Sequence, residues 1–213
     1  MISLTDNLYL GKGRTRECFL DPRDPEKCIK VDFTSKGYHQ TAKEARYYQK
    51  LLKIKPDLHY DFIPRFYGME ETDRGWGGVF DLIRDEDTHE VSLTLGHYLR
   101  DGSVAQDQQI WNAALTEFLA RLMATGVIVR DLNPGNLCAR KRNDGSFQLV
   151  AIDGIGHRDF IPLCDYFLRI ARRKLRRYID KKGMTSIPIL LDHSRKMDRK
   201  REARLASLAR ISP

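Results

Sequence analysis

The chain of 213 residues contains no long apolar run. A membrane-spanning helix needs roughly 20 consecutive apolar residues, and no stretch of the sequence approaches that length. The N-terminal sequence, MISLTDNLYLGKGR, also lacks the basic start and apolar stretch of a signal peptide. We therefore expect a cytoplasmic protein.

Cysteine is scarce, and its spacing fits no common metal motif. The four cysteines form no Cys-x-x-Cys pair, and no His pair has zinc-finger spacing. This pattern argues against a structural metal site. Cys18 and Cys28 could face each other across adjacent strands, but reduced thiols are the expected state in a cytosolic protein.

Acidic residues are scarce at the C-terminal end of the chain. Between Leu168 and Pro213, 15 Lys or Arg stand against four acidic residues, a local excess of +11. Because the whole chain carries +8, the other 167 residues sum to −3. We predict two basic helices here, over 167–183 and 194–211. They could bind phosphates on a membrane surface or nucleic acid, or be solvated helices docked by an apolar stripe.

The stretch VIVRDLNPGNLCAR, residues 127–140, holds Asp131 and Asn136 five positions apart. Pro134 and Gly135 lie between them and force a turn, because Pro fixes φ and Gly admits positive φ. A carboxylate at this place can accept a proton from an attacking hydroxyl, and an amide oxygen can coordinate Mg²⁺. The stretch therefore suits metal-bound phosphate chemistry.

A predicted hairpin follows this turn and ends at Asp153. The sequence Asn143-Asp144-Gly145 is a strong tight-turn signal between two short apolar strands. The hairpin returns the chain to its starting edge, so we expect Asp153 to lie beside Asn136. The two motifs then belong to one site.

The N-terminal stretch LYLGKGRTRECF predicts two short strands around a Gly-Lys-Gly turn. Gly11 and Gly13 would let backbone N–H groups approach a phosphate closely, and Arg14 and Arg16 could meet phosphate oxygens directly. Taken alone, an ordinary hairpin with solvated arginines explains this stretch better.

Lys30 lies in the middle of an apolar strand, CIKVDF. An unpaired buried ammonium is costly, so this Lys needs a partner. Glu44 lies in the first turns of the next predicted helix, over 39–54, and we expect the two side chains to pair. In the alternative, Lys30 reaches solvent from an edge strand and Glu44 lies on the surface. The apolar face of that helix is predicted from Ala42, Ala45, Tyr48 and Leu52.

The rest of the chain predicts strands over 63–72 and 75–83 and helices over 92–101 and 106–126. The last of these helices has the clearest apolar stripe, and Gly126 is its expected stop. The shorter helix would be capped by Ser92 or Thr94. We predict that the long helix contributes only to packing of the core.

The order of these features resembles the protein-kinase-like fold: a Gly-rich turn, a strand Lys, a helix Glu, an Asp-Leu-x-Pro-x-Asn loop and a strand-end Asp. At finer grain, nearly the whole chain resembles the YrbL family, bacterial proteins associated with the PhoP regulatory network. The shared stretches are LGKGRTRECF, CIKV, IPRFYG, Asn-Pro-Gly-Asn-Leu and DGIG.

The resemblance implies a site for ATP and Mg²⁺ between two lobes. Lys30 would contact the nucleotide phosphates, and Glu44 would hold Lys30. Asp131 would accept the proton of the acceptor hydroxyl, while Asn136 and Asp153 would be metal ligands.

The resemblance also assigns the link between the lobes to Gly78–Ile83. By this analogy Phe80 lies beside the nucleotide base, and Asp81 to Arg84, including Leu82, offer backbone groups to the adenine edge.

Four features depart from the kinase pattern. Val129 replaces the His before Arg-Asp, Arg16 replaces the third loop glycine, and Gly-Ile-Gly rather than Phe-Gly follows Asp153. Only about a dozen residues separate Asp153 from the next predicted helix, too few for a peptide platform. We therefore expect a small-molecule, sugar or lipid-linked hydroxyl as acceptor.

We predict an α+β fold with a small β-rich N-lobe, residues 1–83, and a mainly helical C-lobe, residues 84–213. Three hypotheses follow. The chain is an ATP/Mg-dependent phosphotransferase, a catalytically weak or inactive nucleotide-binding regulator linked to the PhoP network, or a nucleic-acid or membrane-surface module built on its basic tail. The sequence leaves the acceptor and the oligomeric state open.

Overall fold

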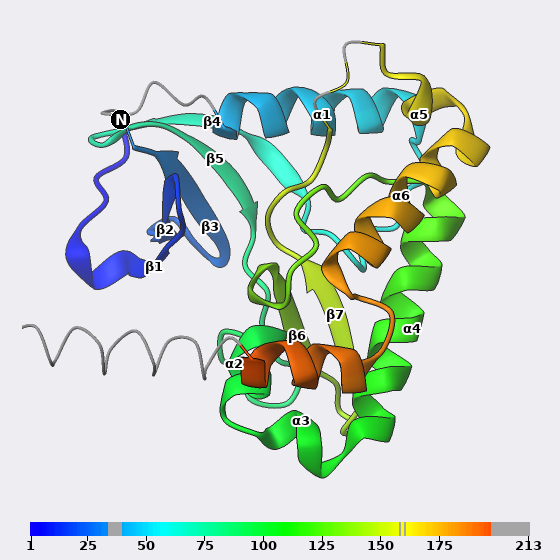
Figure 1. Cartoon of the computed structure of the whole chain (residues 1–213). Helices are drawn as coiled ribbons and strands as arrows, with labels where there is room; N and C mark the ends of the chain where they lie inside the picture. Colours follow the sequence, from blue (N-terminus) through cyan, green and yellow to red (C-terminus); the bar gives the residue numbers. More distant parts are fainter. Residues whose placement is uncertain (34–39, 158, 160, 197–213) are drawn as a thin grey trace, which may run out of the picture.

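The computed structural model describes residues 1–33, 40–157, 159 and 161–196 (Figure 1). Its N-terminal part is an antiparallel sheet of five strands in the order β1-β2-β3-β5-β4. The strands are β1 (Tyr9–Lys12), β2 (Arg16–Asp21), β3 (Asp24–Asp32), β4 (Phe66–Thr72) and β5 (Gly75–Asp81).

Side chains alternate between the two faces of this sheet, so one face carries apolar residues and the other carries charged residues. Phe19, Ile29 and Val31 form a small core with Ile2 and Leu4 on one face. On the other face, Cys18 of β2 is opposite Lys30 of β3. Because residues two apart share a face, Arg16 points to the same side as Cys18. Two cations therefore share the inner face of the sheet.

Helix α1 (Gln40–Ile54) lies against β3, β4 and β5 (Figure 1). Its buried residues are Thr41, Glu44, Ala45, Tyr47, Tyr48 and Leu51. The predicted apolar face was wrong at its edge, because Leu52 is 50% exposed and Ala42 is only partly buried. The physical reason is that two polar residues, Thr41 and Glu44, have partners inside the molecule and turn the helix toward them.

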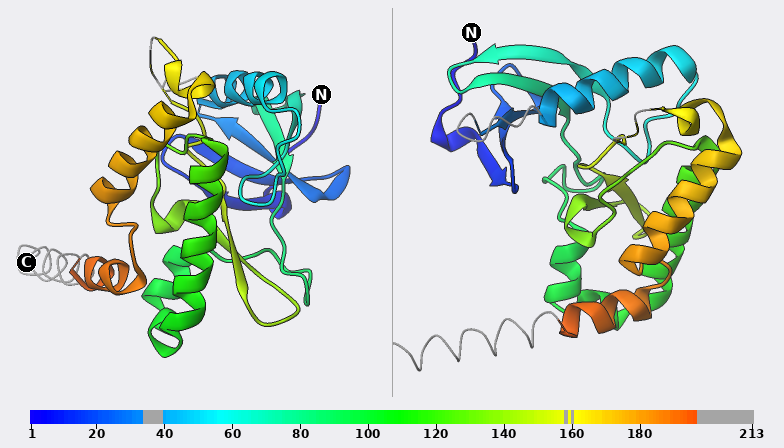
Figure 2. Two further views of the ribbon diagram at one scale, coloured as in Figure 1. Left: turned by 90° about the vertical axis from the view of Figure 1, so that its right-hand side faces the viewer. Right: turned by 45° about the horizontal axis from the view of Figure 1, so that its top comes forward.

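The C-terminal part is mainly helical and contains one β-hairpin (Figure 2). Its helices are α2 (Leu95–Arg100), α3 (Ser103–Gln106), α4 (Gln108–Thr125), α5 (Leu163–Tyr166) and α6 (Leu168–Lys182), and residues 187–196 are also helical. The hairpin pairs β6 (Leu137–Lys141) with β7 (Phe147–Ala151).

The structure confirms the predicted long helix, its stop and the hairpin. α4 buries Trp111, Ala114, Leu115, Phe118 and Leu122, and Gly126 ends it with a φ of 68°. Thr94 caps α2 by accepting a hydrogen bond from the His97 amide. Neither α3 nor α5 was expected, since four residues carry too little periodicity to be recognised.

The basic helix predicted over 167–183 is confirmed as α6. The second basic helix, predicted over 194–211, lies for the most part outside the described residues. Of its span, 194–196 belong to the helical stretch 187–196.

The predicted α+β, protein-kinase-like fold is confirmed by the order of these elements. A five-stranded antiparallel sheet with one long helix precedes a helical part that carries the Asp-Leu-x-Pro-x-Asn loop and its hairpin. One apolar core runs through both parts and joins Tyr48 and Phe80 to Leu115 and Leu137. None of the helices in the described ranges combines the length and apolar character that crossing a bilayer requires.

Candidate functional site

A cavity of about 350 Å³ lies between the inner face of the sheet and the loop that begins the β6–β7 hairpin. Its volume lies within the range of small-molecule pockets. Residues from both parts line it, including Gly11, Gly13, Arg16, Lys30, Asn136 and Asp153. These residues are far apart in the sequence and were expected to form one site, and they do line one cavity.

The wall between these polar groups is largely apolar. Cys28, Ile83, Cys138 and Ile152 all contribute to it. Mostly apolar walls with a few polar groups are the usual form of a small-molecule pocket.

The loop between α4 and β6 is closed by its own side chains. The Asn136 amide donates to both the backbone oxygen and the carboxylate of Asp131, each at 3.1 Å. Asn133 accepts from the Gly135 amide at 3.0 Å, and a short 3-10 helix (Pro134–Asn136) follows. The amide nitrogen of Asn136 thereby orients Asp131 and leaves the amide oxygen for another ligand.

The chain after β7 returns to this loop, as the hairpin predicted. The Ile152 amide donates to the Asn136 carbonyl at 2.8 Å, and the Arg130 amide donates to the Gly154 carbonyl at 2.8 Å. Gly154 has a φ of +76°, and a Cβ built on it would lie 2.7 Å from the Asp131 Cβ. Only glycine fits here, so the close approach of Asp131 to the segment after Asp153 depends on it.

Asp131 itself does not line the cavity. Asp131 accepts a hydrogen bond from Asn136, which does line the cavity, and the Asp131 side chain is 48% exposed. A molecule approaching from solvent can therefore reach Asp131 without crossing the cavity.

Asp153 accepts hydrogen bonds from the Gly154 amide at 2.6 Å and from the guanidinium of Arg16. Burial alone would raise the pKa of Asp153, but the charges of Arg16 and Lys30 outweigh it and lower the pKa below its ordinary value. Asp153 is therefore a carboxylate at neutral pH, which is the form that a metal ion needs.

The expected pair of Lys30 and Glu44 is not formed. Glu44 instead accepts from Arg16 at 2.5 Å, and both side chains are almost fully buried. Lys30 donates to the backbone oxygen of Ile152 and lies 4.6 Å from the centre of the Phe80 ring. Arg16 out-competes Lys30 for Glu44 because its planar guanidinium reaches two carboxylates at once.

Arg14 and Phe80 do not line the cavity. Arg14 is exposed and lies in the bend between β1 and β2, whereas Arg16 begins β2 and lines the cavity, so the two arginines predicted to act together are separated. Phe80 is fully buried and packs 5.6 Å from the Tyr48 ring and 5.2 Å from the Phe66 ring. It supports Lys30 from behind rather than lying beside a bound base.

Asp81 and Leu82 line the cavity, but their amides have partners within the protein. The Leu82 amide donates to the Glu26 carbonyl at 2.8 Å, and the Asp81 amide donates to the Arg65 carbonyl at 3.2 Å. Neither amide is free to donate to an adenine edge, while the contact of the other backbone groups between Asp81 and Arg84 with adenine stays a prediction.

Sequence reasoning missed Lys182, which is the last residue of α6. Its ammonium lies 3.2 Å from Asp131 Oδ1, across 51 residues of sequence. No local signal points to it, because it is one of many cations in a basic helix. The contact places a positive charge beside the carboxylate expected to accept a proton.

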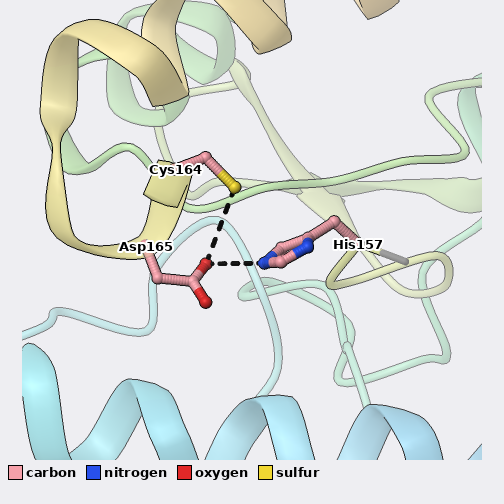
Figure 3. A group of neighbouring side chains, drawn as sticks. All are labelled: His157, Cys164 and Asp165. Carbon is pink, nitrogen blue, oxygen red and sulfur yellow. Dashed lines mark hydrogen bonds and ion pairs between the residues drawn. The ribbon is translucent and has the colours of Figure 1, made fainter. Parts of the chain in front are cut away.

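A second cluster of ionisable side chains lies after Asp153 (Figure 3). His157 Nε2 donates to Asp165 Oδ1 at 2.8 Å, while the Asp159 amide donates to His157 Nδ1 at 3.2 Å. The Cys164 thiol lies 3.9 Å from the same Asp165 oxygen, and burial raises the pKa of that thiol to about 11.

Possible metal-ligand atoms of His157, Cys164 and Asp165 lie within 4.8 Å of one another, a grouping that the cysteine spacing did not predict. Lys50 already neutralises Asp165 by an ion pair. The cluster is therefore satisfied as a hydrogen-bond network that ties the loop to α1 and α5.

The chemistry of the cavity residues fits a hard divalent cation at the Asn136 and Asp153 end. A carboxylate and an amide oxygen are ligands that Mg²⁺ accepts. The guanidinium of Arg16 on Asp153 supplies the positive charge that such an ion would bring. Cation and guanidinium would compete for the same carboxylate.

The family model described as "PhoP regulatory network protein YrbL" matches residues 2–182. Two curated relatives match at the same level, the uncharacterised proteins YrbL of Escherichia coli (strain K12) and of Shigella flexneri. Each is 30% identical over 179 residues, which cover 83% of this chain and 84% of the relative.

Similar solved structures include the PknI kinase domain of Mycobacterium tuberculosis and a mutant of that domain. Each is 19% identical and aligned over 70% of this chain, with TM-scores of 0.45 and 0.44. The aligned part is 58% of the kinase domain, so this chain spans less than two thirds of it. The order of the strands and helices, rather than this likeness, supports the kinase-like fold.

Proposed function

The chain belongs to the family of the PhoP regulatory network protein YrbL, and from that premise we propose that it is an ATP-dependent, kinase-like phosphotransferase. The observation that carries the proposal is that Asn136 and Asp153 line one cavity together with Lys30, while Asn136 holds Asp131 beside that cavity by a hydrogen bond. In the proposal, residues 1–83 form the N-lobe and residues 84–213 the C-lobe.

In the proposed reaction an acceptor hydroxyl attacks the γ-phosphorus of ATP, and the bond to the β,γ-bridging oxygen breaks to release ADP. Asp131 accepts the hydroxyl proton, held for this role by Asn136. Lys182 lies beside Asp131, where it can meet the negative charge that develops on the transferred group. Asn136 and Asp153 would hold Mg²⁺, which supplies charge neutralisation at the phosphates.

Lys30 and the glycine turn would hold the nucleotide phosphates from the sheet side of the cavity. Lys30 makes no ion pair with a carboxylate within the described part of the chain, so its ammonium is available to a phosphate. Gly11 and Gly13 line the same wall and carry no side chain to block a phosphate. Arg16 completes the site by holding Glu44 and Asp153 in place.

The acceptor in this proposal is a hydroxyl of a non-protein molecule. Nine residues separate Asp153 from α5, and the His157 network ties this short segment to α1. Because this segment is short and held against α1, it offers no extended surface on which a peptide chain could bind.

The test is turnover of γ-labelled ATP with Mg²⁺ by the purified full-length chain, first alone and then with cell extract. Asp131→Asn should abolish transfer while keeping ATP affinity, measured by thermal shift, because binding stabilises the native state. Label transferred mainly into protein bands would contradict the non-protein acceptor. Transfer by the Asp131→Asn variant at the wild-type rate would contradict the assigned base.

A second candidate is a regulator that binds nucleotide without transferring phosphate. The observation in its favour is the bond from Arg16 to both Glu44 and Asp153, which holds the expected metal ligand in an ion pair. A thermal shift with ATP, together with no transfer by the wild-type chain in any extract fraction, would favour this candidate.

A further inference from the structure

The outward side of α6 is a continuous basic face, defined here by Arg169, Arg173, Arg176 and Arg177. The opposite side of the helix is buried through Ala171, Leu175 and Ile179. Figure 2 shows α6 on the outside of the molecule beside α4, and α6 packs against α4. The four arginines therefore point away from the core.

These arginines are unpaired in the described structure, although the carboxylate of Asp180 lines the same surface. None of the four makes an ion pair or a side-chain hydrogen bond within the described ranges, whereas Arg172 at the edge of the face donates to the Met123 carbonyl. Together with Arg172 and Asp180 they line a shallow hollow of about 480 Å³. Like charges one turn apart on a helix repel each other, so an anionic partner would reduce the repulsion between these arginines.

A group of exposed apolar side chains directly precedes and enters this face. Five large apolar residues within ten positions are 41–64% exposed: Ile161, Leu163, Tyr166, Phe167 and Ile170. Exposed apolar residues are ordinary when scattered, but a group of this size beside a charged face marks an interaction surface.

We propose that the basic face of α6 and the apolar group at 161–170 together bind the surface of a membrane that contains anionic lipid. The arginines would meet headgroup phosphates, and the apolar side chains would enter the boundary between headgroups and acyl chains. Nucleic acid would satisfy the arginines but not the aliphatic side chains of Ile161, Leu163 and Ile170. The inference does not depend on phosphate transfer in the cavity.

The expected effect can be sized from the charges. Each basic residue near an anionic membrane surface strengthens binding by about fivefold. The double substitution Arg173→Glu/Arg177→Glu should therefore weaken binding by roughly 25-fold or more. The matched control is Lys43→Glu/Lys53→Glu, which makes the same charge change at two exposed positions of α1.

The experiment is flotation of the full-length chain with vesicles of phosphatidylcholine alone or mixed with phosphatidylglycerol, at low and high salt. We expect binding to the anionic vesicles that the control keeps and the α6 variant loses. The variant Phe167→Ser/Ile170→Ser should lose the part of binding that resists salt. Circular dichroism confirms that each variant is folded.

Three results would overturn the proposal. In the first, the wild-type chain does not bind anionic vesicles. In the second, the α6 variant and its control bind these vesicles equally. In the third, the α6 substitutions weaken binding to duplex DNA or RNA but leave binding to vesicles unchanged. The last result would assign the face to nucleic acid instead.

Discussion

Arg16 on β2 donates a hydrogen bond of 2.5 Å to Glu44 on α1, and the two side chains are 5% and 0% exposed. The same guanidinium donates to Asp153 after β7. One side chain thus joins the sheet, the helix that covers it and the polar end of the cavity. Burial lowers the pKa of Arg16, but Glu44 and Asp153 outweigh that effect and raise it, so its charge is permanent.

Removing this cation should destabilise the fold. In Arg16→Gln two carboxylates lose their shared partner, and breaking a buried ion pair from one side costs about 3 kcal/mol or more. Urea denaturation measures the change in the free energy of unfolding. The control is Arg14→Gln, two residues away and exposed, which should change it by less than about 0.5 kcal/mol. Equal effects of the two substitutions would show that the pair carries no stability.

The parts of the site that could be predicted from sequence are those built by local chain geometry. Asp131 and Asn136 lie on one tight turn, and the Asn143-Asp144-Gly145 signal brings the strand before Asp153 back to them. Each step spans few residues, so turn and strand rules were sufficient.

The contacts that sequence reasoning missed join residues far apart in the chain. Arg16 and Glu44 are 28 positions apart, and Lys182 and Asp131 are 51 apart. Lys30 and Arg16 are on the same face of adjacent strands, and both are candidates for one buried carboxylate. Only the packing of α1 on the sheet decides between them, and no local pattern encodes that packing.

Lys182 should affect turnover much more than stability. In Lys182→Met we expect a roughly 100-fold lower kcat, the size of effect seen when one preorganised donor to a developing charge is removed. The KM for ATP should change little, because Lys182 lies beside Asp131 and does not line the cavity. The neighbouring Lys181→Met is the control. A KM effect with unchanged kcat would place Lys182 in substrate binding instead.

The pair of Lys50 and Asp165 should hold the loop after Asp153 to α1. Asp165 is 1% exposed at its side chain and accepts from Lys50 and His157. Asp165→Asn should cost about 3 kcal/mol, because Lys50 loses its counter-charge. A double-mutant cycle with Lys50→Met, read by urea denaturation, isolates the coupling between the two. Asp180→Asn on the exposed side of α6 is the control, and additivity of the two losses would refute the coupling.

Asp153 should make stability depend on pH in the acid range. Because Arg16 and Lys30 lower its pKa below the ordinary 3.8 despite burial, the folded state favours the carboxylate more than the unfolded state does. The resulting stabilisation is fully present above the unfolded pKa and is lost as pH falls through the lower, folded pKa. The stability gap between wild type and Asp153→Asn should therefore be constant at higher pH and narrow once pH drops below 3.8.

Urea denaturation of both proteins between about pH 3 and 6 measures this gap, since that range spans the usual carboxylate titration. The exposed Asp57→Asn serves as the control, and its gap to wild type should stay near zero throughout. The same comparison in an Arg16→Gln background tests the cause. Without the guanidinium, the stability gap produced by Asp153→Asn should begin to narrow at a higher pH. A gap for Asp153→Asn that stays constant down to the acid end would mean that Arg16 and Lys30 do not stabilise the Asp153 carboxylate in the folded protein.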